Sequence, residues 1–264
     1  MRRSIAAAII GLGLLGGCSA PGSLEQGEVY DPLEVPNRLV FAVNETLDIF
    51  ILQPTAYVYR TVIPDPVRDM VAGFLGWIAT PVILANDAFQ GDWDGAGITA
   101  QRFVANAPLF GLVDNATGLG LKAQNEDFGQ TLGHYGAGDG PYLMLPVLGP
   151  SNARDGVGKV VDYFLDPTRY IGDEDVNTKF QIGRRAMGAV DFRARNFDAI
   201  NDLRESSVDY YARVRSIYKQ RRDALIRDGE PGSFGASSPK SDSNEFDRYP
   251  GTSTEQTSST VSTN

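Results

Sequence analysis

The stretch from Glu126 to Gly158 constrains the fold most, because it is rich in chain-breaking residues and also strongly apolar. The segment from Tyr142 to Leu148 is too apolar for a solvated loop, and no residue between Asp139 and Arg154 is charged. A long regular element is excluded by the glycines and prolines, which are Gly129, Gly133, Gly136, Gly138, Gly140, Pro141, Pro146, Gly149 and Pro150. The stretch therefore predicts irregular backbone packed against a protein core or against lipid acyl chains.

Three more uncharged runs occupy residues 49–59, 70–86 and 103–113, and each is interrupted by Pro or Gly. Any one of them could belong to a protein core, but four in one chain favour contact with a membrane. The run 70–86 is shorter than the roughly 20 apolar residues that span a bilayer. Thr80-Pro81 is typical of a new helix start, so we expect two short helices joined at an angle, lying in one leaflet.

The remaining pattern predicts a mainly α-helical protein. Apolar periodicity and capping residues indicate helices over 39–52, from 65 onward, 92–107, 126–132, 151–165, 173–203 and 207–227. We expect Asn125 to cap the short helix from Glu126. No convincing alternating strand pattern is present.

The helix predicted over 207–227 has a basic face formed by Arg213, Arg215, Lys219, Arg221, Arg222 and Arg227. Two interpretations remain open at this point. The face could contact phospholipid headgroups or an acidic protein, or it could simply be solvated.

The amino terminus is typical of a lipoprotein signal. Arg2 and Arg3 precede an apolar run over residues 5–15, and small residues lead to Cys18. An ordinary signal peptide with an incidental cysteine is the alternative. We expect Cys18 to become the first mature residue and to carry acyl chains, and Ser19 after it, by analogy with enteric sorting, predicts the outer membrane.

The predicted organisation has four parts. A signal peptide covers residues 1–17, a lipidated tether 18–30, a helical domain 31–228 and a disordered tail 229–264, which is rich in Ser, Thr, Gly and Pro.

Several classes of function find no support. The formal charge of −9 argues against nucleic acid as a partner. With one cysteine and one histidine, His134, the chain cannot build a zinc-thiolate or histidine metal cluster. The glycines at 136–140 lack the Lys-Ser/Thr of a phosphate loop, and no Gly-x-Ser-x-Gly elbow occurs. We therefore expect no catalytic residue, no metal and no cofactor.

Residues 128–146 read Phe-Gly-Gln-Thr-Leu-Gly-His-Tyr-Gly-Ala-Gly-Asp-Gly-Pro-Tyr-Leu-Met-Leu-Pro. This wording resembles the signature of the MlaA/VacJ lipoproteins of Gram-negative outer membranes. The opening Asp31-Pro32-Leu33-Glu34 with Asn37-Arg38, and the later Gln90-Gly91-Asp92, are also similar to that family. The resemblance is strong from Asp31 to about Tyr170 and looser to Arg227.

The resemblance implies both a fold and a function. The expected fold is a ring-like bundle of amphipathic and broken apolar helices, embedded in the periplasm-facing leaflet of the outer membrane, around an amphipathic channel. The implied activity removes misplaced phospholipid from the outer leaflet and maintains lipid asymmetry. The implied partners are phospholipid, an outer-membrane trimeric porin and a soluble periplasmic lipid carrier of the Mla pathway.

Polar groups within apolar surroundings are the candidate channel or lipid contacts, together with the Gly/Pro stretch. They are Asn44, Asn86, Asn106, Tyr142 and Leu145. Each could equally be a helix cap or a core hydrogen-bonding group. Two other functions stay open: a structural envelope lipoprotein that tethers partners without moving lipid, and a lipid-cleaving enzyme that uses His134.

Overall fold

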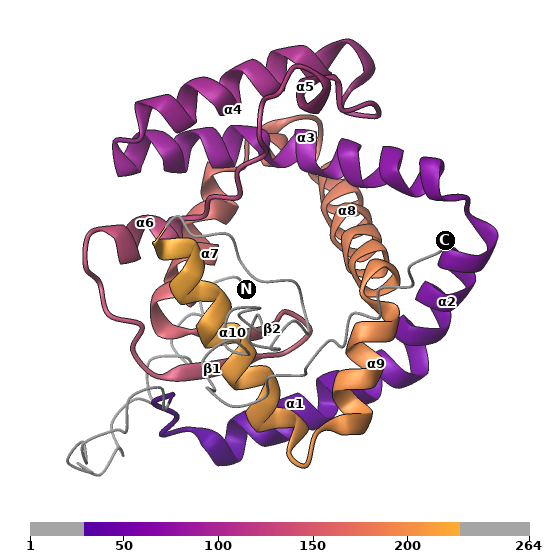
Figure 1. Cartoon of the computed structure of the whole chain (residues 1–264), viewed down its shortest axis with the longest axis vertical. Helices are drawn as coiled ribbons and strands as arrows, with labels where there is room; N and C mark the ends of the chain where they lie inside the picture. Colours follow the sequence, from indigo (N-terminus) through magenta and orange to yellow (C-terminus); the bar gives the residue numbers. More distant parts are fainter. Residues whose placement is uncertain (1–28, 228–264) are drawn as a thin grey trace, which may run out of the picture.

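The computed structural model describes residues 29–227, whose helices are arranged in a ring (Figure 1). The predicted signal peptide, Cys18 and the predicted tail lie outside the described residues. The described part is mainly helical, as the sequence predicts.

The elements follow one another around the ring. They are α1 (Glu34–Leu47), the π-helical η2 (Asp48–Leu52), α2 (Gln53–Val62), α3 (Asp65–Gln90), α4 (Trp93–Asn106), the 3-10 turn η3 (Ala107–Leu109), α5 (Asn115–Gly118), α6 (Phe128–His134), β1 (Tyr142–Leu145), β2 (Gly149–Asn152), α7 (Ala153–Leu165), the 3-10 turn η4 (Pro167–Tyr170), α8 (Glu174–Arg195), α9 (Phe197–Ser206) and α10 (Tyr210–Ile226).

Side-chain caps fix several helix starts. Asp92 accepts a hydrogen bond from the Gly95 N–H at 2.9 Å, and Asn152 accepts one from the Asp155 N–H at 2.7 Å. The predicted cap Asn125 is wrong. Asp127 caps α6 instead, accepting from the Gln130 N–H at 2.9 Å, because the chain stays extended up to Asp127.

The prediction of two short helices within 70–86 is also wrong, because α3 runs without interruption from Asp65 to Gln90 with Pro81 inside it. The missing N–H of a proline costs a helix one hydrogen bond. α3 tolerates this loss where it packs on α4 and α6. Among the described residues, α3 is long and apolar enough to cross a membrane. It nevertheless lies in the plane of the ring (Figure 1).

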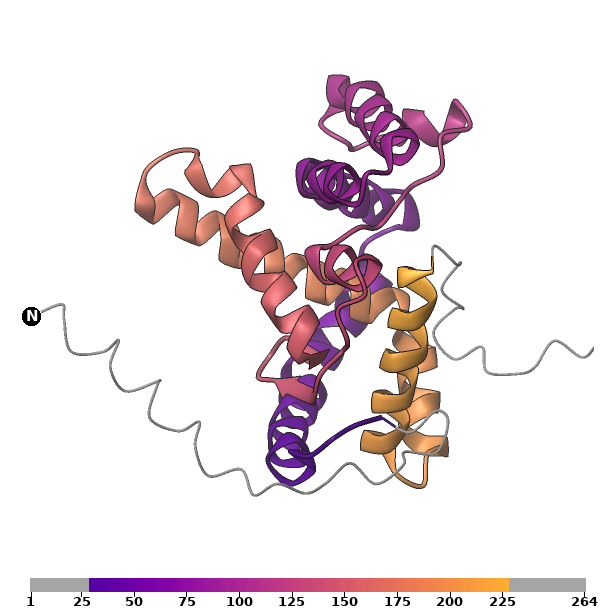
Figure 2. The same ribbon diagram turned by 90° about the vertical axis from the view of Figure 1, so that its left-hand side faces the viewer.

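The helix predicted over 173–203 is two helices, α8 and α9, since the backbone at Asn196 (φ −106°, ψ 23°) leaves the helical conformation. Seen from the side, α7 and α8 leave the ring plane on one face, and α10 lies on the opposite face (Figure 2).

A β-hairpin that the sequence pattern did not reveal closes the Gly/Pro stretch. β1 and β2 are antiparallel, with Tyr142 opposite Asn152 and Leu145 opposite Gly149. The free edge of β1 is bound by an asparagine side chain of α1. The Asn37 Nδ2 donates to Tyr142 O at 3.0 Å, and Asn37 Oδ1 accepts from the Met144 N–H at 2.9 Å. One amide side chain thus substitutes for a neighbouring strand.

Ion pairs join α10 to the rest of the ring. Arg222, which is buried, contacts Asp127 Oδ2 at 2.6 Å and donates to Asp155 Oδ1 at 3.1 Å. Burial alone would raise the pKa of Asp127, but hydrogen bonding to Arg222 holds that pKa below its ordinary value. α10 is therefore held to α6 and α7 by charge as well as by packing.

We expect the substitution Arg222→Met to lower the free energy of unfolding by about 3–5 kcal/mol at pH 7, because it leaves buried carboxylates without their partner. The depressed pKa of Asp127 contributes stability that is present above its unfolded pKa and is lost as the pH falls below about 4. The difference between Arg222→Met and wild type should therefore shrink at pH 3. Denaturant unfolding in detergent measures both values.

The control for this experiment is Arg221→Met, since Arg221 is the exposed neighbour on the same helix. Its effect should stay within about 0.5 kcal/mol. Equal losses for the two variants would contradict the role given to the buried pair.

We expect Asn37→Ala to destabilise the fold by about 1–3 kcal/mol, because Tyr142 O and the Met144 N–H lose their buried partner. Asn115→Ala is the control. Its Nδ2 makes one exposed bond to Ala105 O at 3.2 Å, so its loss should cost less than about 1 kcal/mol. Unfolding midpoints of the two variants, measured side by side, test the assignment.

Candidate functional site

The distribution of polarity in the described residues is the reverse of that in a water-soluble protein. Polar and charged residues outnumber apolar ones among the buried side chains, and they include Asn86, Asp87 and Arg193 at 2% exposure or less. Large apolar side chains are exposed along almost every helix. Soluble monomers rarely expose contiguous apolar surface of this extent, which marks contact with lipid or protein.

The most continuous apolar surface runs along α1, η2 and α2, which we call the apolar belt. Phe50 in η2 is 75% exposed and Ile51 is 59% exposed. The other exposed members are Leu39, Val43, Leu47, Ile49, Tyr57, Val58 and Val62. These elements form one continuous side of the ring (Figure 1). The helix predicted to be apolar on every side therefore turns much of that surface outward.

A second apolar surface covers α7, η4 and α8 on the face opposite α10 (Figure 2). Tyr170 and Ile171, at the turn between the two helices, are 70% and 68% exposed. Val157, Val160, Phe164, Val176 and Ile182 are exposed along the same two helices. Apolar side chains thus reach beyond the belt on one face of the ring.

The charged groups that face inward are paired across the ring. Asp48, at the start of η2, contacts Arg193 Nε at 2.9 Å and Arg204 Nη2 at 2.5 Å. Arg193 also donates to Asn201 Oδ1 at 2.6 Å. Sequence reasoning did not assign this cluster. The available signal was Asp48 itself, a lone charge within an apolar run.

Asn44 binds the hairpin turn from α1. Its Nδ2 donates to Leu145 O at 2.9 Å, and its Oδ1 accepts from the Val147 N–H at 2.8 Å. Leu145 is half-buried in β1, so two of the candidate lipid contacts lie together. Val147 has a positive φ of 66°, which is unusual for a β-branched residue, and the bond to Asn44 holds its N–H in that conformation.

Asn86 is fully buried between α3, α6 and α7. Its Nδ2 donates to Asp162 Oδ1 at 2.9 Å, and its Oδ1 accepts from the Thr131 hydroxyl at 3.0 Å. The structure places this residue where three helices meet.

Tyr142 is 1% exposed and packs edge-on against Tyr211 and Tyr218 of α10. Its hydroxyl has no hydrogen-bond partner, and burial raises its pKa well above the ordinary value.

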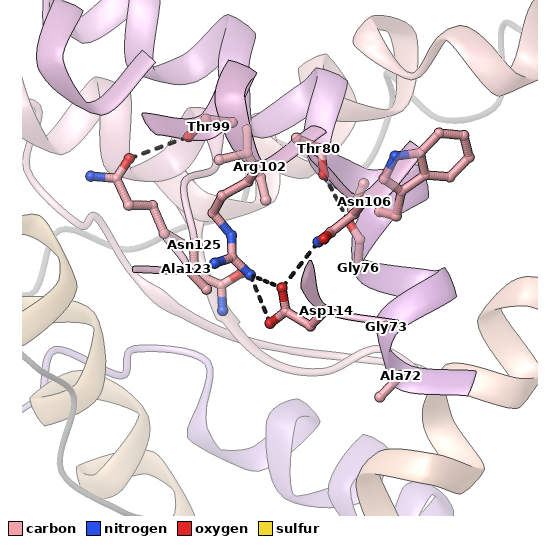
Figure 3. Close-up of a pocket in the computed structure, with 14 residues that line it drawn as sticks. Ala72, Gly73, Gly76, Thr80, Thr99, Arg102, Asn106, Asp114, Ala123 and Asn125 are labelled. Carbon is pink, nitrogen blue, oxygen red and sulfur yellow. Dashed lines mark hydrogen bonds and ion pairs between the residues drawn. The ribbon is translucent and has the colours of Figure 1, made fainter. Parts of the chain in front are cut away.

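Asn106 lies at the end of α4. It donates to Asp114 Oδ1 at 3.1 Å and accepts from the Ala116 N–H at 3.0 Å. It also lines a cavity of about 320 Å³ between α3, α4 and residues 123–125 (Figure 3). Of the five candidates that the structure describes, Asn106 is the one placed at this cavity.

The basic face predicted for the last helix is largely turned inward, which neither of the two interpretations included. Arg215 contacts Asp31 Oδ2 at 2.7 Å, Lys219 contacts Asp139 Oδ2 at 2.6 Å, and Arg222 pairs as described above. Arg221 and Arg227 remain exposed.

His134 is exposed at the end of α6 beside the ring of Tyr135. Within residues 29–227, no group of three His, Cys, Asp or Glu side chains is placed to hold a metal ion.

Comparisons with known proteins give a consistent relationship. The model of the MlaA lipoprotein family matches residues 29–225. The intermembrane phospholipid transport system lipoprotein MlaA of Escherichia coli is 34% identical over 236 residues, which cover 87% of this chain and 91% of that protein. An uncharacterised protein of Rickettsia bellii is 35% identical over 216 residues, covering 81% of this chain and 82% of that protein.

A solved structure, from work on the structural basis for maintenance of bacterial outer membrane lipid asymmetry, superimposes with a TM-score of 0.62. It is 33% identical in sequence and covers 74% of this chain and 98% of its own. The signature over residues 128–146, the outward apolar surfaces and these matches lead to one conclusion: the chain belongs to the MlaA lipoprotein family.

Proposed function

We propose that this outer-membrane lipoprotein removes misplaced phospholipid from the outer leaflet and passes it toward the periplasm, which maintains the lipid asymmetry of the outer membrane. The E. coli relative is named for intermembrane phospholipid transport, and the matched structure concerns outer-membrane lipid asymmetry. The family is one of transport lipoproteins, so the chain is not an enzyme.

One observation carries this proposal: apolar side chains point outward from the ring, and polar or charged ones are buried within it. A phospholipid that moves between leaflets must keep its headgroup out of hydrocarbon, where an unpartnered charge is very costly. A protein with a lipid-facing exterior and polar groups inside lowers that barrier. No bond is made or broken in the process.

The arrangement of the elements supports a position within one leaflet. α1, α2 and α3 all lie in the ring plane, so the long apolar α3 contacts acyl chains along its side (Figure 1). The polar face of α10 is then directed to the periplasm, and the apolar turn between α7 and α8 toward the bilayer (Figure 2).

The finer assignments belong to the same proposal. They are Cys18 as the acylated residue after a signal peptide over residues 1–17, a tether over 18–30, a helical domain over 31–228, and a tail over 229–264. A trimeric porin and a soluble periplasmic lipid carrier are the proposed partners. The porin would hold the ring in the membrane, and the carrier would receive the lipid.

We expect deletion of the gene, or Cys18→Ala, to raise phospholipid in the outer leaflet and to increase sensitivity to detergent. Without its acyl chains, the protein loses roughly 0.8 kcal/mol of membrane affinity for every buried methylene. Surface labelling of phospholipid in intact cells measures the effect, and the reintroduced wild-type gene is the control. An unchanged lipid distribution in the deletion strain would instead favour a tethering lipoprotein.

The apolar belt gives a second test. In the Cys18→Ala background, we expect Phe50→Asp with Ile51→Asp to abolish flotation of the full chain with phospholipid vesicles, because each charge in hydrocarbon costs about 2–3 kcal/mol. Val208→Asp is the control. Val208 is fully exposed in the loop between α9 and α10, beside the polar face. If both variants float as well as Cys18→Ala alone, the belt does not face lipid.

A further inference from the structure

The cavity of about 320 Å³ beside α3 has two chemically different walls (Figure 3). Ala72, Gly76, Ala79 and Ile83 of α3 form an apolar wall with the ring of Trp77. Trp77 is fixed there, since its Nε1 donates to Phe103 O at 3.0 Å and its ring stacks on Phe103 at 5.1 Å. Small side chains on α3 leave the space, and a rigid indole bounds it.

The opposite wall, from α4, α5 and residues 123–125, is polar but carries no net charge of its own. Arg102 and Asp114 pair in a bidentate arrangement, with 3.1 and 3.0 Å from Nη2 to the two carboxylate oxygens. Hydrogen bonds from Thr117, Asn106 and Arg102 outweigh the effect of burial and lower the pKa of Asp114 to about 2, so this pair stays ionised. A wall of this kind tolerates a zwitterion or an alcohol better than an unpaired ion.

One corner of the cavity has more acceptors than donors. The single hydroxyl proton of Thr99 is donated to Asp87 Oδ2 at 2.6 Å, so it is not available to Gln124 Oε1, which lies 3.3 Å from the same oxygen. Behind Thr99, the other oxygen of Asp87, Oδ1, has no partner in a residue that is 1% exposed. A ligand at this corner is favoured if it brings N–H or O–H donors.

We propose that this cavity binds the headgroup of a phospholipid that carries hydrogen-bond donors, an ammonium or hydroxyl group, with the first carbons of an acyl chain against the α3 wall. The proposal rests on the lipid-transport function proposed above. The volume equals that of about ten waters at roughly 30 Å³ each, so the headgroup fits and most of each acyl chain stays outside. Gly76, at the cavity wall, is exposed, which leaves room for those chains to leave.

Glycines on α3 and α4 provide a matched pair of variants. A Cβ added at Gly76 or at Gly97 meets no atom within 4 Å, so both helices accept a larger side chain. Gly76 lines the cavity and Gly97 does not. Gly76→Leu should therefore reduce the free volume, and Gly97→Leu, the same chemical change in a neighbouring helix, should not.

The full chain is purified in detergent and equilibrated with equal amounts of phosphatidylethanolamine, phosphatidylglycerol and phosphatidylcholine, and the retained lipid is identified by native mass spectrometry. The first two lipids carry ammonium or hydroxyl donors in the headgroup, and the third carries none. We expect retention of the donor-bearing lipids to exceed that of phosphatidylcholine by about fivefold, the value of one net hydrogen bond. Comparison of the first two distinguishes ammonium from hydroxyl.

Gly76→Leu should lower lipid retention about tenfold, because overfilling a packed site is costly, while Gly97→Leu retains lipid as wild type does. Gln124→Leu removes an acceptor at the corner and should bring the preference over phosphatidylcholine close to one. Equal retention of all three lipids by wild type, or equal retention by the two glycine variants, would overturn the proposal.

Failure of the site and failure of the proposed function are distinguishable. If deletion of the gene disturbs outer-leaflet phospholipid and Gly76→Leu restores it while retaining lipid normally, the cavity is not a lipid site. If deletion leaves lipid distribution unchanged, the transport function is lost, and with it the premise of the site.

Discussion

The pairing of buried charges across the ring is the interaction on which the structure depends. Asp48 on η2 contacts Arg193 and Arg204, and Arg222 on α10 contacts Asp127 and Asp155. Because so many large apolar side chains face outward, they cannot form the central core that holds a soluble bundle together. The ring is held instead by groups that must find a partner, since an unpaired buried charge is strongly destabilising.

The π-helical segment η2 shows how the backbone serves both requirements. It begins at Asp48, whose carboxylate reaches inward to two arginines, and it continues through Phe50 and Ile51, which are exposed. Since a π turn contains more than the usual number of residues, side chains after it are rotated relative to those of α1. This local change lets one short segment present a charge to the interior and apolar groups to the outside.

Sequence reasoning reached the helices, the family resemblance and the excess of apolar surface, because each depends on local pattern. It did not reach the hairpin clasp, since Asn37 and Met144 are far apart in the chain and an isolated asparagine in a helix carries no visible partner. It divided α3 at Pro81 because the cost of a proline is local, whereas the packing that offsets this cost is not. The inward direction of Arg215 and Lys219 was hidden for the same reason: a basic helix face does not reveal the carboxylates opposite it.

The ion pairs that close the ring connect residues from opposite ends of the described chain, such as Asp31 with Arg215 and Asp48 with Arg204. A chain that is exported from its amino terminus presents α1, η2 and α2 long before α10 has emerged. During that interval the apolar belt has neither lipid nor a finished ring beside it, and such surfaces aggregate readily. Biogenesis of this protein therefore calls for a holding chaperone that shields the first three helices until the last one arrives.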